Sequence, residues 1–88
     1  MADDYHFRHW RLRADMVEAL QFYAVERIPV GDFLTAALEN SLLEAIGRAD
    51  DDNLQNIPAL GAYIYHELPS QCHGSPKRVK DWLGKKED

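Results

Sequence analysis

The sequence predicts a small all-α protein, a single domain built as a bundle of about four helices. Apolar residues recur at intervals of three and four along most of the chain, which is the period of an amphipathic helix. No stretch alternates apolar and polar residues over a length that indicates a strand. The 88 residues have the length of one domain, and 45% of them are apolar, so the chain can bury a core.

The first two helices are predicted from apolar spacing and from the residues that end them. Apolar residues from Met16 to Ile28 predict a helix over residues 14–27, because a residue that precedes proline, here Ile28, disfavours the helical conformation. The longest periodic run follows and predicts one continuous helix over residues 31–48.

The later helices are predicted from their capping signals. A third helix ends at Leu68-Pro69, and because Pro58 fits only a first turn, this helix either begins near Asn56 or is kinked. Ser75 and Pro76 are typical of an N-cap and a first helical position, and they predict a last helix over residues 76–86.

Charge is distributed unevenly along the chain, whose formal net charge is -5. Residues 14–68 contain ten acidic side chains against Arg27 and Arg48, a sum of -8, whereas both ends are mildly basic. We therefore divide the chain into a basic and aromatic arm, residues 1–13, and a helical domain, residues 14–88. No apolar run has the length of a membrane span, no export signal is evident, and Cys72 is the single cysteine, so we expect a cytoplasmic protein.

The block from Pro29 to Asp50, followed by the segment 72–75 and by Trp82, resembles a family of short uncharacterised proteins of bacteriophages and prophages. Their pattern is approximately P-x-G-x-F-L-T-A-x-L-x-N-D-L-x-E-A-x-x-R-A-D, followed by C-x-G-S and a tryptophan. This chain matches it from Pro29 to Asp50, then with Cys72-His73-Gly74-Ser75 and with Trp82, although Ser41 replaces the usual aspartate. The resemblance covers roughly residues 16–83. It implies a helical fold and a phage or prophage origin, hence a bacterial host cell, and it implies no activity.

A mixed polar strip on the predicted helix 31–48 is the first candidate for a partner-binding site. Asn40, Ser41, Glu44 and Arg48 project onto one arc, next to the apolar face, and Glu44 and Arg48 have the spacing of a helical ion pair. The alternative is a structural network that only satisfies neighbouring backbone groups. The adjacent Asp50, Asp51 and Asp52 extend this candidate surface, although capping of the next helix is the favoured explanation for them and their spacing does not fit a calcium loop.

The first thirteen residues offer a different candidate, a nucleic-acid contact. Aromatic and cationic side chains alternate there, and Arg8, Trp10, Arg11 and Arg13 could contact bases and phosphates. The acidic charge of the remaining chain opposes this function. The competing prediction is an arm whose aromatic side chains pack onto the helices.

Neither metal binding nor catalysis is predicted. His66, Cys72 and His73 lie close in sequence, and so do His6 and His9, but the four ligands of a closed zinc site are not evident. Cys72 is more typical of a small buried apolar residue than of a nucleophile. We therefore expect no enzyme and no cofactor.

These observations favour a phage protein that acts by protein–protein contact, as a monomer or a homodimer. Its expected partner is a host or phage protein, and the sharper hypothesis is modulation of a host protein machine such as a defence system, in the manner of an anti-CRISPR protein. The alternatives are a nucleic-acid-binding regulator that uses the arm and the last helix, and a self-associating structural protein.

Overall fold

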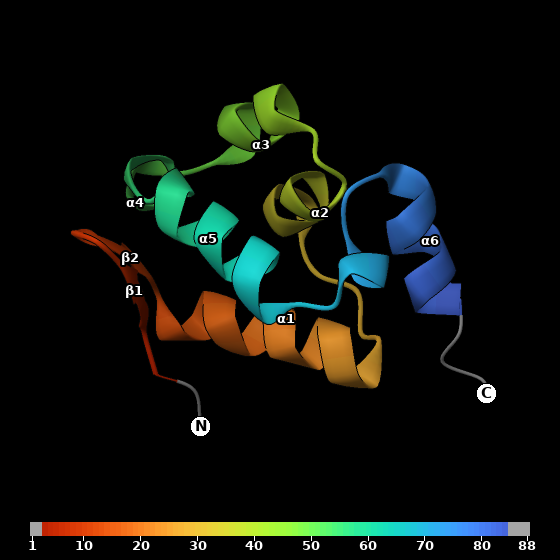
Figure 1. Ribbon diagram of the computed structural model, residues 1–88. Coiled ribbons are helices and arrows are strands. Elements are labelled where there is room, and N and C mark those ends of the chain that lie inside the picture. Colours follow the sequence, from red (N-terminus) through yellow and green to blue (C-terminus); the bar gives the residue numbers. More distant parts are fainter. Residues whose placement is uncertain (1–2, 85–88) are drawn as a thin grey trace.

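The computed structural model describes residues 3–84 of the chain. Within this range six α-helices, one 3-10 turn and a two-stranded hairpin follow one another (Figure 1). Their bounds are β1 Tyr5–Phe7, β2 Trp10–Leu12, α1 Ala14–Glu26, α2 Asp32–Leu38, α3 Leu42–Arg48, α4 Asp51–Gln55, α5 Ile57–Glu67, η1 Ser70–Cys72 and α6 Pro76–Gly84. The mostly helical single globule is confirmed, whereas the prediction of a purely α-helical bundle with four helices is wrong.

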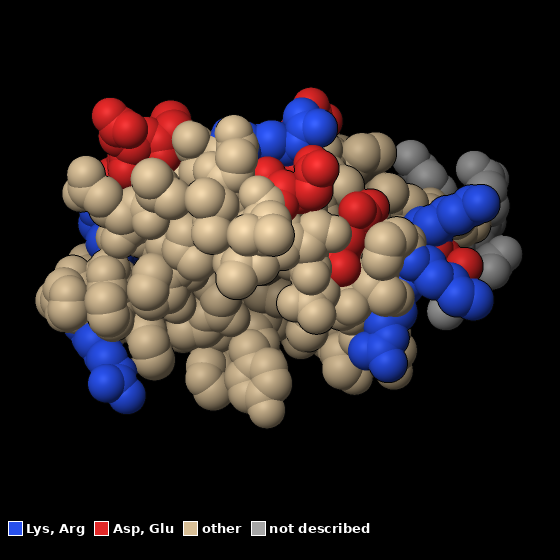
Figure 2. All heavy atoms as spheres, turned by 90° about the horizontal axis from the view of Figure 1, so that it is seen from above, with Lys and Arg blue, Asp and Glu red and all other residues tan. Residues whose placement is uncertain are grey.

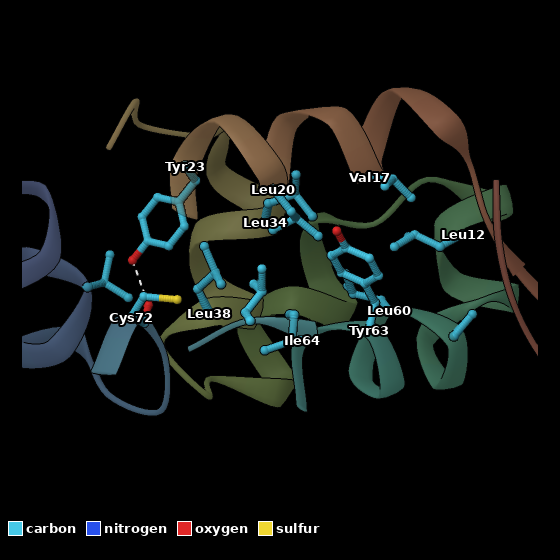
Figure 3. Close-up of a cluster of buried hydrophobic side chains, with 13 residues drawn as sticks. Leu12, Val17, Leu20, Tyr23, Leu34, Leu38, Leu60, Tyr63, Ile64 and Cys72 are labelled. Carbon is cyan, nitrogen blue, oxygen red and sulfur yellow. Dashed lines mark hydrogen bonds between the residues drawn. The ribbon is translucent and has the colours of Figure 1, made fainter. Parts of the chain in front are cut away.

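The core lies between α1 and the layer formed by α2 and α5. In Figure 1, α1 runs along the bottom of the molecule, α2 and α5 lie above it, and α3 and α4 lie at the top. The hairpin lies at one end of α1 and α6 lies toward the other. Leu20, Tyr23 and Leu38 have no exposed surface, and Leu60 and Ile64 from α5 complete the centre of the cluster (Figure 3).

The N-terminal arm forms the hairpin, and it packs on the helices. Tyr5 pairs with Leu12 and Phe7 with Trp10 in antiparallel register. Leu12 is buried, and the ring of Tyr5 meets the ring of Tyr63 edge-on at 5.0 Å. The alternation of inward apolar and outward polar residues is that of a strand, but at three residues a strand it is too short to be recognised in the sequence.

The predicted helix over residues 31–48 is wrong as one continuous element, because it breaks at Asn40. Asn40 adopts a left-handed conformation with φ 65°. Its backbone N–H donates to the carbonyl oxygen of Ala37, and the N–H of Ser41 donates to that of Ala36. These two bonds define a Schellman motif with asparagine at the left-handed position. Hence α2 and α3 form an elbow, and the polar strip projected on a single helix does not exist as such.

The start of the third predicted helix is resolved in favour of Asn56. Helix α5 begins at Ile57, and Pro58 lies in its first turn. The chain reaches this point through the short helix α4, whose N-cap is Asp50: its carboxylate accepts from the N–H of Asn53 at 2.8 Å. Capping by this aspartate is therefore confirmed.

The first and last predicted helices are confirmed apart from their ends. Helix α1 ends at Glu26, because Arg27 adopts a left-handed conformation with φ 59°. Helix α6 begins at Pro76 and is capped by Ser75, whose hydroxyl accepts from the N–H of Arg78 at 3.2 Å. The last two residues of the predicted helix, 85 and 86, lie outside the described residues. No helix within residues 3–84 is long and apolar enough to span a membrane.

Candidate functional site

The two surfaces predicted from the sequence meet each other in the structure. Asp52 of α4 lies beside the hairpin, where its carboxylate is 3.4 Å from the Arg13 guanidinium and 3.8 Å from that of Arg11. Arg11 also pairs with Asp4 at 3.0 Å, and Arg13 with Asp15 at 3.2 Å. The hydrogen bond to Arg11 lowers the pKa of Asp4. Acidic and basic groups that were assigned to different partners thus neutralise one another within the molecule.

Asn56 joins the same two elements through its side chain. Its Oδ1 accepts a 2.7 Å hydrogen bond from the N–H of Arg11, and its Nδ2 donates to the carbonyl oxygen of Asp52 at 2.8 Å. One amide therefore satisfies a strand donor and a helix acceptor that are far apart in sequence. The role of Asn56 was not predicted, because it depends on this long-range contact.

The remaining residues of these two predicted surfaces, Asp51, Arg8 and Trp10, form none of these ion pairs. Asp51 and Arg8 are exposed, and Arg8 sits in the hairpin turn with its guanidinium 5.3 Å from the centre of the Phe7 ring. Trp10 is half-buried and stacks on Phe7, with 6.4 Å between the ring centres. Of the three arginines predicted to contact nucleic acid, Arg8 alone forms no ion pair with the described residues.

The elbow between α2 and α3 separates the residues of the predicted polar strip. Glu44 and Arg48 form the expected helical pair at 3.1 Å, and Arg48 also lies 3.4 Å from the carboxylate of Asp32. Asn40 and Ser41 lie at the bend itself. Ser41 still lines one hollow together with Glu44 and Arg48, whereas Asn40 does not.

A mostly apolar groove lies between the elbow and α5, and the sequence reasoning missed it. Its volume is about 380 Å³. Leu42 and Tyr65 line it although 59% and 76% of their surface is exposed, so large apolar groups face solvent here. The full lining is Ala37, Leu38, Asn40, Ser41, Leu42, Ala45, Ile57, Leu60, Gly61, Ile64, Tyr65, His73 and Gly74.

An acidic hollow of about 200 Å³ adjoins the groove at the elbow, and Ser41 lines both. Asp32, Glu39 and Glu44 contribute carboxylates to it, and Arg48 contributes the one cation. Viewed from above, acidic groups border a broad surface without charged side chains, while basic groups gather at the end occupied by α6 (Figure 2). The polar residues named from the sequence thus border an apolar surface. Periodicity alone did not reveal this surface, since a periodic leucine such as Leu42 is assigned to the core.

Three positions of the segment Cys72-His73-Gly74-Ser75 have a structural role: Cys72, Gly74 and Ser75. The Cys72 side chain is fully buried, and its burial raises the pKa of the thiol to about 11, so the thiol is protonated at neutral pH. Gly74 has φ 115° and donates a 2.7 Å hydrogen bond to the carbonyl oxygen of Leu38, at the end of α2. Ser75 caps α6. This turn therefore supports the elbow that forms one wall of the groove.

The histidines and the cysteine do not assemble into a metal site. Cys72 is buried in the core, His66 is exposed and His73 is half-buried. Within the described residues no group of three or more histidine, cysteine, aspartate or glutamate side chains is arranged to hold a metal ion.

Comparisons of the chain with models of protein families, with curated proteins and with solved structures find no match. The resemblance of residues 16–83 to phage proteins therefore stays a prediction, and the functional argument depends on the groove and its surroundings.

Proposed function

We propose that the protein acts by protein–protein contact through the groove between the α2–α3 elbow and α5. One observation supports this proposal above all: a groove of about 380 Å³ is open to solvent and exposes Leu42 and Tyr65 on its walls. Each Å² of apolar area removed from water contributes about 25 cal/mol toward association, from which the entropic cost of binding is subtracted. Apolar groups concentrated around a concave surface are typical of interaction sites.

The groove replaces the aspartate cluster as the centre of the proposed surface. The carboxylate of Asp50 caps helix α4, and the carboxylate of Asp52 pairs with two arginines. Among the three aspartates, Asp51 is therefore the one that forms neither an ion pair nor a cap with the described residues. Asn40 and Ser41 remain part of the proposed surface because they line the groove, and Glu44 and Arg48 remain because they line the adjoining hollow.

The biological target is proposed on the sequence resemblance together with this surface. A phage protein that carries an exposed binding groove is suited to modulate a protein machine of the bacterial host, and a defence system is the target that we propose. Nucleic-acid binding receives less support, because Arg11 and Arg13 already pair with carboxylates and the groove presents no cation to a phosphate.

Two glycines provide a matched test of this function. The Cβ of a residue at Gly61 would meet no heavy atom within 4 Å, and Gly61 lines the groove, so Gly61→Leu places a bulky side chain at the groove and its Cβ is accommodated. Gly47 is a glycine of α3 with equally open surroundings, and it does not line the groove, so Gly47→Leu is the control. Both changes favour the helical conformation.

The experiment is affinity capture from a bacterial host lysate with wild type, Gly61→Leu and Gly47→Leu, followed by quantitative mass spectrometry. We expect a host protein that wild type and Gly47→Leu recover equally and that Gly61→Leu loses by at least about tenfold. Recovery of the same proteins by all three chains would contradict the proposed function.

A further inference from the structure

We infer that the groove binds an amphipathic helical segment of a partner whose apolar face is flanked by lysine or arginine. This inference rests on the proposed function and specifies the chemistry of the partner. It follows from the shape of the groove, from the charges around it and from the openness at Gly61.

The groove suits a few apolar side chains presented by a helix. Its volume of about 380 Å³ is near the lower end of the range for ligand pockets, about 300–1,000 Å³. Its walls come from two directions, the elbow with Leu42 and Ala45 on one side and α5 with Ile64 and Tyr65 on the other. Gly61 leaves room for another helix to approach closely, because even a Cβ there would meet no heavy atom within 4 Å. An amphipathic helix that enters such a groove contributes apolar residues at i, i+3 or i+4, and i+7.

The charges select a basic partner. The hollow that adjoins the groove is lined by three acidic residues, Asp32, Glu39 and Glu44, against one basic residue, Arg48, a sum of -2. Arg48 already pairs with Glu44 and Asp32, and Glu39 in the same hollow forms no ion pair with the described residues. Because the hollow adjoins the groove at Ser41, a cation beside the apolar face of a bound helix would meet these carboxylates.

The same charges argue against two other occupants. A second copy of the chain that docked face to face would bring two of these hollows together, each with three carboxylates and one arginine, which costs free energy at ordinary ionic strength. A nucleic acid would place phosphates beside the carboxylates of Glu39 and Glu44. A basic amphipathic helix matches both the apolar groove and its acidic border.

Two designed peptides test the inference by fluorescence anisotropy. Both have about 15 residues and leucines at i, i+4 and i+7, but one is flanked by lysines and the other by glutamates. We expect the lysine peptide to bind wild type and Gly47→Leu alike, and to bind Gly61→Leu at least about tenfold more weakly. The glutamate peptide is expected to bind wild type at least about tenfold more weakly than the lysine peptide does.

Substitution of one carboxylate at a time distinguishes a local contact with the peptide's lysines from a general attraction of the peptide to an acidic protein. Glu39→Gln is expected to weaken the lysine peptide about two- to fivefold, which is the effect of one exposed ion pair. Glu18→Gln removes the same charge from the exposed surface of α1 and is expected to change nothing. Far-ultraviolet circular dichroism of each variant verifies that its fold is retained.

Each contrary result overturns the inference in a distinguishable way. Equal binding of both peptides with loss in Gly61→Leu would show an apolar site without charge selection, and the proposed function would stand. Binding of the lysine peptide that is unaffected by Gly61→Leu would show diffuse attraction outside the groove. A dimer in sedimentation that Gly61→Leu abolishes would place a second copy there. If neither peptide binds, the inference is wrong, and the lysate comparison alone decides the proposed function.

Discussion

The hydroxyl of Tyr23 donates a 2.6 Å hydrogen bond to the main-chain carbonyl oxygen of Cys72, 49 residues further along the chain (Figure 3). Tyr23 is fully buried, and burial raises its pKa above the ordinary value of 10.0, so the hydroxyl remains a donor at neutral pH. The backbone carbonyl of Tyr23 in turn accepts from the indole N–H of Trp82 at 3.0 Å. This residue thus connects α1 both to the turn that supports the groove and to α6.

Tyr23→Phe is therefore expected to destabilise the protein by about 1–3 kcal/mol, because the buried carbonyl oxygen of Cys72 loses its donor. Urea denaturation followed by circular dichroism measures the change. Tyr65→Phe removes a hydroxyl from a ring that is 76% exposed and is expected to leave the free energy of unfolding within about 0.5 kcal/mol of wild type. Equal values for the two variants would show that the buried hydrogen bond contributes nothing.

The break at Asn40 supports a second prediction. Only glycine and, less well, asparagine adopt the left-handed conformation at small cost, so Asn40→Ala is expected to destabilise by about 1 kcal/mol. Asn40→Gly is expected to be neutral or slightly stabilising at this position. Thermal denaturation of both variants provides the comparison. A stable Asn40→Ala protein would mean that residues 32–48 can form the continuous helix that the sequence indicates.

The sequence could predict helices whose ends are set by neighbouring residues, but not the elbow, which depends partly on a distant segment. Helices α1 and α6 have local signals, Pro29 after the first and the Ser75-Pro76 start of the second, and these were interpreted correctly. Pro58 left two alternatives for α5, a start near Asn56 or a kink, and the structure has the first. The elbow was missed because the apolar period continues through Asn40 and because part of its support, the hydrogen bond from Gly74 to Leu38, comes from a distant segment.

The candidate site was predictable to a smaller extent for the same reason. Asn40, Ser41, Glu44 and Arg48 do lie around the proposed surface, although on two sides of a bend. The apolar groove itself was not predictable, because a periodic leucine such as Leu42 is assigned to a core unless the bend that exposes it is known. The pairing of Asp52 with Arg11 and Arg13 likewise depends on the hairpin, which was not recognised in the sequence.

Asp52 supports a third prediction, on the dependence of stability on salt. Its carboxylate pairs with Arg11 and Arg13, whose side chains are 43% and 31% exposed, so Asp52→Asn is expected to destabilise by up to about 1 kcal/mol. Asp51→Asn removes a charge from the same first turn of α4 and serves as the matched control. In chemical denaturation with urea, the difference between the two variants is expected to shrink at 1 M NaCl, where the Debye length is about 3 Å. A difference that is unchanged by salt would contradict an electrostatic origin.

His73 supports a fourth prediction, on the dependence of stability on pH. Its Nε2 is buried, and the described residues offer it no hydrogen-bond partner. Desolvation lowers the pKa of His73 below its ordinary value of 6.5, helped by the nearby charge of Arg78, while a hydrogen bond with the backbone of Leu68 opposes the shift. Below pH 6.5 the unfolded chain therefore binds a proton that the folded chain resists, so the free energy of unfolding falls as the pH decreases.

The measurement is urea denaturation between pH 7.5 and 5.5 for wild type, His73→Gln and His66→Gln. We expect wild type and His66→Gln, which changes an exposed side chain, to lose stability in parallel as the pH falls, and His73→Gln to lose less. His73 also lines the groove and precedes Gly74. Because its protonation disturbs the turn at Gly74, a peptide that covers this wall of the groove is expected to bind more weakly at pH 5.5. Identical pH profiles for all three proteins would show that the buried imidazole titrates alike in the folded and unfolded chains.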